Sequence, residues 1–132
     1  MATAKPGQHM MNTDVCVPVS RLAECIMASK EDLERSGLIS PFIGHAGDGN
    51  FHMSIIANYD DAEESRLAHE FHDRLVHRAQ AMEGTCTGEH GVGSGKIAYL
   101  EAELGGAVDV MRAVKVALDP KNIMNPGKLL RL

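Results

Sequence analysis

The sequence has no tryptophan, few cysteines and no long apolar run. Its three cysteines, Cys16, Cys25 and Cys86, are an odd number without CxxC spacing. That pattern fits free thiols in a reducing compartment better than a disulfide framework, so we expect a cytoplasmic location. No apolar stretch approaches the roughly 20 residues that cross a bilayer, and no membrane-spanning helix is expected.

Basic residues are also in the minority, with 13 Lys and Arg against 18 Asp and Glu and a net charge of -5. A nucleic-acid-binding surface would need clustered positive charge, so no nucleic-acid partner is expected. Hydrophobic residues at 44% and charged residues at 23% are typical of a globular chain. A length of 132 residues predicts one domain. Residues 1–11 are polar and irregular, which predicts a tag-like or disordered start before a domain over 12–132.

Hydrophobic periodicity predicts an alternation of strands and helices. The run 15–19 alternates valines with Cys and Pro, which is typical of a short strand. Ser20 as N-cap and Gly37 as C-cap would bound a first helix, and apolar residues at three- and four-residue steps predict another over 60–82. The other expected elements are a hairpin of strands 38–44 and 51–57 and helices at 96–104 and 107–118. This order predicts an α+β fold, a partial ferredoxin-like layer of antiparallel sheet with helices on one face, followed by C-terminal helices.

The segment GHAGDGNFH at 44–52 places a histidine on each side of a polar turn. The predicted hairpin would bring His45 and His52 together, and two imidazoles that converge in this way are typical metal ligands. The competing interpretation makes 48–50 a type I′ turn and each His a hydrogen-bonded surface residue. Taken alone, a pair of histidines favours the competing interpretation.

A second segment, TCTGEHGVG at 85–93, lies within a stretch that has five glycines between positions 84 and 95. Such a loop needs unusual backbone dihedrals or a close approach to another group. Glu89 could complete a His-His-carboxylate metal set, and His90 could accept a proton as a general base. The alternative is an anion-binding or helix-entry loop in which both side chains are solvated. The spacing does not decide between them.

Three further histidines belong to the helix predicted over 60–82. His69 and His77 fall opposite its apolar stripe, which indicates a solvated face rather than a metal site. His72 is interpreted in the same way. The methionines considered as possible ligands are interpreted as core residues instead: Met53, Met82 and Met111.

Three segments together carry a resemblance to a known family. GHAGDGNFH at 44–52, TGEHGVG at 87–93 and LDPKNIMNPGK at 118–128 resemble, in this order and spacing, the C-terminal domain of FAD-linked oxidases in the vanillyl-alcohol-oxidase superfamily. The resemblance runs from about residue 12 to the C-terminus. The segment 13–22 looks most like the branch that contains D-lactate dehydrogenase (cytochrome) and the FAD subunit of glycolate oxidase.

The resemblance implies a role for several residues. His45, His52 and Glu89 match the family's metal ligands, and zinc or manganese would be the metal. His90 matches its active-site base, and Asn125 lies where the family's C-terminal tail returns to the flavin. The implied activity is an FAD-dependent D-2-hydroxy-acid dehydrogenase with a quinone or cytochrome as electron acceptor.

Two positions bear on the substrate. Relatives that act on 2-hydroxydicarboxylates tend to have a Lys near position 12 and an Asn near position 54, whereas this chain has Asn12 and Ser54. A distal carboxylate would lose its cationic partner, which favours a small monocarboxylate such as D-lactate or glycolate.

The resemblance covers the last part of the family's substrate domain, and the FAD-binding domain is not within these 132 residues. We therefore expect a fragment that does not turn over alone, because the flavin is the hydride acceptor. An intact enzyme could associate with a membrane, and an open sheet edge would favour a homodimer. The alternative functions are a non-catalytic metal- or anion-binding module and a purely structural domain.

Overall fold

One strand, β4 (Asn50–Ala57), organises the sheet, and every pairing with it is antiparallel. On one side lies β3 (Phe42–His45), joined to β4 through the short 3-10 turn η1 (Ala46–Asp48). On the other side lie β1 (His9–Asn12) and β2 (Val15–Cys16). The predicted hairpin is therefore confirmed. On its β4 side the sheet continues with β1 and β2, which come from the start of the chain.

The computed structural model describes residues 6–132, which divide into two compact units, 6–89 and 90–132. Within the first unit, β1 and β2 are two parts of one edge, because they keep a single register along β4. Asp14 lies in the gap between them. Continued through the gap, that register places Asp14 opposite His52, a pairing that the functional site uses.

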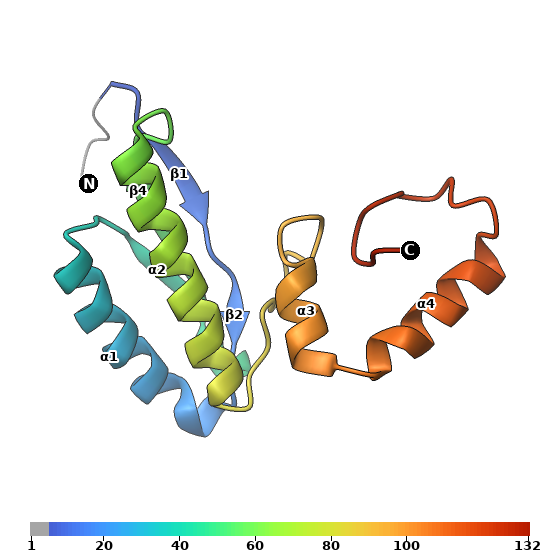
Figure 1. The fold of residues 1–132 in the computed structure, drawn as a ribbon. Helices are drawn as coiled ribbons and strands as arrows, with labels where there is room; N and C mark the ends of the chain where they lie inside the picture. The colour runs from blue at the N-terminus through green and yellow to red at the C-terminus, as the bar shows by residue number, and fades with distance from the viewer. Residues whose placement is uncertain (1–5) are drawn as a thin grey trace. The chain divides into compact units, whose positions relative to one another are not determined.

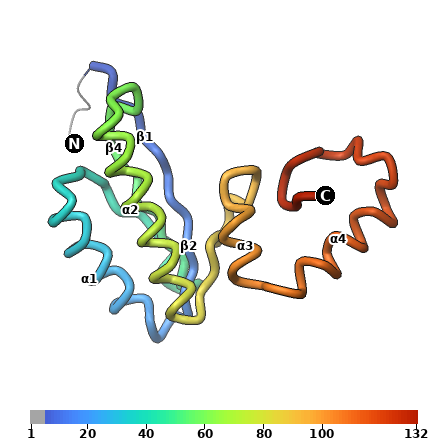
Figure 2. The backbone as a smooth tube through the Cα atoms, in the orientation of Figure 1, coloured from blue at the N-terminus to red at the C-terminus, as the bar shows by residue number. Residues whose placement is uncertain are grey.

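Two helices, α1 (Val19–Ser36) and α2 (Ala62–Ala81), lie side by side on one face of this sheet (Figures 1 and 2). Alternate residues of β4 are at most 1% exposed and form the core with these helices: Phe51, Met53 and Ile55. Because side chains alternate along a strand, the opposite face of β4 carries the polar residues Asn50, His52 and Ser54. The predicted α+β class, with helices on one face of an antiparallel sheet, is confirmed.

A buried charge joins α1 to α2. Asp32 of α1 is 6% exposed and accepts hydrogen bonds from the guanidinium groups of Arg74 at 2.9 Å and Arg78 at 2.8 Å. Burial raises the pKa of Asp32, but the hydrogen bonds and charges of the two arginines outweigh it and hold the pKa below its ordinary value. Asp32 is thus an ionised link between the two helices, and the same arginines also donate to Ser29 and Ser36 of α1.

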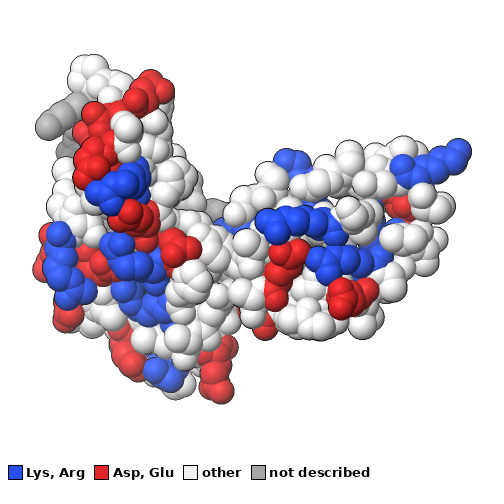
Figure 3. All heavy atoms as spheres, in the orientation of Figure 1, with Lys and Arg blue, Asp and Glu red and all other residues white. Residues whose placement is uncertain are grey.

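The outer face of α2 is densely charged, with acidic and basic groups intermingled (Figure 3). Arg66 pairs with Glu63 one turn before it and with Glu70 one turn after it, each at 2.6 Å. Such exposed pairs contribute little to stability individually. Among the described residues, no helix is both long enough and apolar enough to cross a membrane.

The second unit contains α3 (Ile97–Leu104), α4 (Ala107–Leu118) and the C-terminal tail. Asp119 caps the turn after α4, because it accepts hydrogen bonds from the backbone N–H groups of Ile123 at 3.0 Å and Met124 at 2.8 Å. Lys115 of α4 also donates to this carboxylate. The turn after α4 is therefore organised around one buried acid.

Some predicted boundaries are wrong. The prediction of an irregular start over residues 1–11 is wrong for residues 9–11. These residues belong to β1, because their backbone pairs with β4. Residues 1–5 lie outside the described part of the chain. The expected N-cap Ser20 is also wrong, since α1 begins at Val19 and Pro18 caps it without a side-chain hydrogen bond. The C-cap is as predicted, with Gly37 in the left-handed region at φ 66°.

Candidate functional site

The hairpin brings the side chains of His45 and His52 next to each other on the polar face of the sheet. His45 is the last residue of β3 and lies opposite Asn50, two residues before His52 on β4. The ring centroids are 6.1 Å apart, and the rings meet edge to face at 83°. His45 is exposed, whereas His52 is only 9% exposed.

The turn between these histidines differs from the type I′ turn considered from the sequence. Ala46–Asp48 form a 3-10 turn, which Gly49 ends in the left-handed region at φ 71°. A Cβ atom on Gly49 would lie 2.0 Å from the carbonyl oxygen of Val17. Glycine is therefore required there twice, by the backbone dihedral and by the closeness of the neighbouring strand.

Glu89 supplies a carboxylate to the two histidines. Its Oε1 lies 2.7 Å from Nε2 of His52 and 3.5 Å from Nε2 of His45. One ligand atom of each of the three residues lies within 4.8 Å of the other two. Ligands bound at about 2.0–2.2 Å to a single ion in tetrahedral geometry lie about 3.3–3.6 Å apart, so this donor set fits one divalent ion after small side-chain movements.

A cavity of about 330 Å³ opens beside these side chains. Its lining comes from the hairpin, β2 and the Glu89 loop: Cys16, His45, Asp48, Asn50, Gly88 and Glu89. Burial raises the pKa of the Cys16 thiol, and the charges of Asp14 and Asp48 raise it further. The protonated thiol donates to the backbone oxygen of Asp48 at 3.2 Å, which disfavours a thiolate ligand here.

The backbone orients the His52 ring. Its Nδ1 lies 3.2 Å from the carbonyl oxygen of Thr13, an acceptor that favours the tautomer with the proton on Nδ1. In that tautomer Nε2 keeps its lone pair, and Nε2 is the nitrogen nearest Glu89. Proteins commonly orient a metal-binding imidazole by a hydrogen bond at the ring nitrogen that does not bind the metal.

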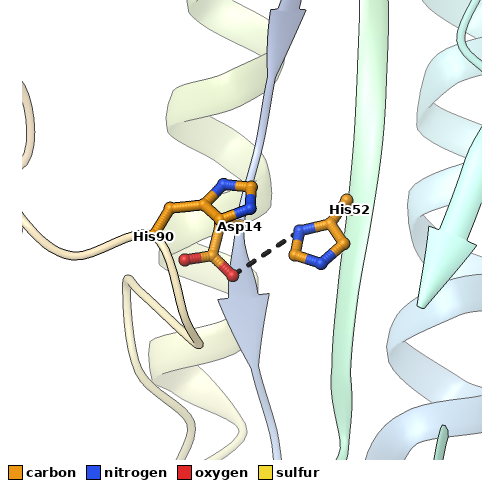
Figure 4. Close-up of side chains that lie close together, drawn as sticks. All are labelled: Asp14, His52 and His90. Atoms are coloured by element: carbon orange, nitrogen blue, oxygen red, sulfur yellow. Dashed lines mark ion pairs between the residues drawn. The ribbon is translucent and has the colours of Figure 1, made fainter. Parts of the chain in front are cut away.

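Asp14 is the residue of this site that sequence reasoning missed. Its carboxylate lies 3.6 Å from Nδ1 of His52 (Figure 4) and is 1% exposed. It also accepts hydrogen bonds from the Thr87 hydroxyl at 2.8 Å and the Glu89 backbone N–H at 3.1 Å. The sequence offered one signal for Asp14, an acid directly before the alternating valine run. An acid at the start of a buried strand needs partners for its charge.

The remaining predicted site residues lie in the second unit. His90 is exposed and directly follows Glu89 in the chain. Asn125 lies in the C-terminal tail at φ 47° and lines a groove of about 530 Å³ beside α4. Their roles as general base and as flavin contact stay predictions.

The histidines of α2 take no part in the described site. His69 and His77 are exposed, and His77 contacts the backbone oxygen of Asp73 at 2.8 Å. No group of converging ligand atoms found among the described residues includes a histidine of this helix. Of the methionines interpreted as core, Met53 and Met82 are buried and Met111 is half-buried.

Comparison with known proteins identifies the family. The model of the FAD linked oxidases, C-terminal domain, matches residues 1–129. The chain belongs to this family. The family match also includes residues 1–11, which the sequence interpretation had set apart from the domain.

Individual relatives within the family agree. A probable mitochondrial D-lactate dehydrogenase of Danio rerio is 50% identical over 129 residues, 97% of this chain and 26% of that protein. A mitochondrial D-lactate dehydrogenase [cytochrome] of Arabidopsis thaliana is 53% identical over 126 residues, 95% of the chain and 22% of that protein. Glycolate oxidase subunit GlcD of Bacillus subtilis is 37% identical over 117 residues, 88% of the chain and 25% of that protein.

The chain thus spans about a quarter of the length of the curated relatives it matches. Two of these relatives are named as mitochondrial, a compartment that the cysteine pattern did not predict. The cytoplasmic location stays a prediction for this chain.

Proposed function

We propose that this chain forms the metal- and substrate-binding part of an FAD-dependent dehydrogenase that oxidises a small D-2-hydroxy acid to the 2-oxo acid. The observation that carries the proposal is the convergence of His45, His52 and Glu89 beside a cavity of about 330 Å³. These residues come from β3, β4 and a glycine-rich loop, so only the folded chain assembles them. Membership of the FAD-linked oxidase family supports the redox chemistry.

The three ligands would hold a divalent ion, zinc or manganese, at the rim of the cavity. Such an ion supplies positive charge that favours the deprotonated form of a substrate hydroxyl. The chain's own contribution is orientation, because the bond of His52 Nδ1 to the Thr13 carbonyl directs Nε2 toward Glu89. A substrate carboxylate and hydroxyl in the cavity would then meet a site that is already arranged.

His90 is proposed as the general base. Its α-carbon lies one peptide unit from that of Glu89, about 3.8 Å, so the residue is covalently tied to the metal site. An imidazole accepts a proton near neutral pH, as removal of the substrate hydroxyl proton requires. FAD, which Asn125 is proposed to approach in the intact enzyme, supplies the hydride acceptor.

The substrate is proposed to be a monocarboxylate of the D-lactate or glycolate type. On the polar face of the sheet, the Ser54 hydroxyl donates to Asn12 Oδ1 at 2.7 Å, so the two side chains are hydrogen-bonded to each other. This neutral pair offers no cation to a second carboxylate. The names of the relatives from Arabidopsis thaliana and Bacillus subtilis support the substrate class, and the first of them names a cytochrome. A cytochrome or quinone as electron acceptor is part of the proposal.

Titration of the full chain with Zn²⁺ and Mn²⁺ tests the metal site. We expect one ion per chain, and the His45→Ala/His52→Ala variant should lose at least about 100-fold in affinity because two of three ligands are gone. The matched control is His69→Ala/His77→Ala, which removes two exposed imidazoles from α2 and should bind like the wild type. A wild type that binds no ion, or a control that loses as much as the site variant, would overturn the metal assignment.

The substrate class is tested on the Mn²⁺-loaded chain. Paramagnetic broadening of ligand proton NMR signals should be strong for D-lactate and glycolate and weak for D-2-hydroxyglutarate. Equal broadening of the dicarboxylate would contradict the monocarboxylate proposal. The Asn12→Lys variant should raise the broadening of D-2-hydroxyglutarate, since it restores a cation beside Ser54.

A further inference from the structure

We propose that Asp14 is a positioning residue for the metal site, which it assembles by clamping the Glu89 loop onto the strand that carries His52. The inference rests on the proposed function, because it assumes that His45, His52 and Glu89 bind the ion. Asp14 lies outside both segments that contain the site histidines, 44–52 and 85–93. Asp14 itself is not proposed to contact the ion or the substrate.

The clamp holds the loop through one carboxylate oxygen of Asp14. Oδ2 of Asp14 accepts hydrogen bonds from the Thr87 hydroxyl at 2.8 Å, the Gly88 N–H at 2.9 Å and the Glu89 N–H at 3.1 Å. Consecutive donors that converge on one carboxylate fix the local path of a loop. The backbone of the ligand Glu89 is therefore held by Asp14 itself.

The clamp reaches the strand through the other carboxylate oxygen. Oδ1 of Asp14 accepts a hydrogen bond from Asn50 Nδ2 at 2.8 Å and lies 3.6 Å from Nδ1 of His52. Asn50 and His52 belong to β4, on the polar face of the sheet. One buried carboxylate thus links β4 to the loop of Glu89. Asp14 itself comes from the gap between β1 and β2, more than 70 residues before Glu89 in the sequence.

Packing at Gly88 also brings the loop backbone very close to Asn50 and Asp14. A Cβ atom on Gly88 would lie 1.8 Å from Asn50 Nδ2 and 2.8 Å from Asp14 Oδ1. The loop backbone therefore rests directly against the clamp. The glycine of the GEH motif is required by this contact, and its N–H donates to the same carboxylate.

The charge of Asp14 also acts on the His52 ring. A carboxylate beside Nδ1 stabilises the proton on that nitrogen and makes Nε2 a better electron donor. Partners of this kind behind a metal ligand are worth about 10–100-fold in metal affinity. Asp14 is buried, so its charge acts on His52 without the screening that an exposed acid would suffer.

Zn²⁺ titration of the full-chain Asp14→Asn variant tests the inference, since this change keeps the side-chain size and removes the charge. We expect a loss of about 10–100-fold in affinity. Asp60→Asn is the charge-matched control, because Asp60 is exposed in the turn before α2 and does not line the cavity. It should lose less than about threefold.

A second control separates positioning from general destabilisation. Asp32→Asn removes a buried acid between α1 and α2, on the other face of the sheet, and should lower stability without changing affinity for Zn²⁺. Thr87→Val removes one hydroxyl donor to Asp14 and is a milder variant should Asp14→Asn not fold. We expect a loss of a few-fold for it.

A spectroscopic signature gives an independent readout. The ¹⁵N shifts of the His52 ring should report a proton on Nδ1 in the wild type and a larger share of the other tautomer in Asp14→Asn, where the Thr13 carbonyl remains as acceptor but the carboxylate charge is gone. If wild type binds Zn²⁺ and Asp14→Asn binds it as tightly, with unchanged ring shifts, the positioning role is wrong although the metal site stands. If wild type itself binds no Zn²⁺, the proposed function fails first.

Discussion

The two units of this chain bury their apolar residues very differently. In the first unit, the alternate residues Phe51, Met53 and Ile55 of β4 are at most 1% exposed. In the second, α4 has one buried residue, Val108, while Val110 is 66% exposed. Further apolar residues of this unit are more than half exposed: Val114, Val116, Leu118, Ile123 and Met124.

This contrast indicates where stability resides. Burial of apolar surface is the dominant favourable term in folding, and a helix with an uncovered apolar face gains little of it. The first unit therefore has its own core, and the proposed ligands His45, His52 and Glu89 all belong to it. The second unit buries fewer apolar residues, among them Ile97 and Leu100, and has local hydrogen bonds such as those to Asp119.

The largest effect should come from the core of the first unit. Phe71 of α2 is fully buried, and Phe71→Ala should lower the free energy of unfolding by about 3–5 kcal/mol because it leaves a cavity. Urea denaturation followed by circular dichroism measures the change. A loss below about 1 kcal/mol would mean that the sheet and helices do not form the stable core described above.

A somewhat smaller loss is expected from the buried charge of the first unit. Asp32→Asn should cost about 2–3 kcal/mol, because it removes the charge that Arg74 and Arg78 bind. The folded-state pKa of Asp32 lies below the ordinary 3.8, so its contribution is present above that pH. It is lost as the pH falls through the folded-state pKa. Stability measured against pH should decline less steeply on the acid side in the variant, and identical profiles would contradict the assignment.

Hydrogen exchange should separate the two units directly. Amides of α4 are expected to exchange about tenfold or more faster than those of β4, because fewer apolar contacts oppose local opening. NMR or mass spectrometry of the full chain in D₂O gives the rates. Equal protection in both elements would show that the second unit is as stable as the first, and the comparison would then fail.

The smallest effect is expected on the surface of α4. Leu118 is 77% exposed, so Leu118→Gln should change the free energy of unfolding by less than about 0.5 kcal/mol. Thermal unfolding beside the wild type measures it. A destabilisation of more than 1 kcal/mol, of the order of a lost core contact, would mean that this face is covered in solution.

Much of the fold could be read from local patterns. The apolar residues of the second long helix recur at helical spacing, and α2 spans 62–81 where the pattern predicted 60–82. Its actual N-cap is Asp61, which accepts from the N–H groups of Glu63 and Glu64. By contrast, β1 was missed because His9–Asn12 shows no alternation of apolar and polar residues. Its strand conformation comes from pairing with a segment more than 40 residues away.

The candidate site divides in the same way. The motifs that contain His45, His52 and Glu89 were visible because metal-ligating residues and glycines stand close together in the sequence. What the residues alone left open was whether each histidine faced solvent or a common centre. The hairpin register and the Glu89 loop answer this geometrically, since Nε2 of both rings lies within 3.5 Å of one carboxylate oxygen.

By itself, then, the sequence determined the family, the long helices and the hairpin, because each depends on residues that are near neighbours along the chain. Only the tertiary structure decided the role of Asp14, whose partners are the His52 strand and the Glu89 loop. The physical reason is that strand register and the burial of a charge are set by contacts between distant segments. No local pattern around position 14 encodes which donors will meet its carboxylate.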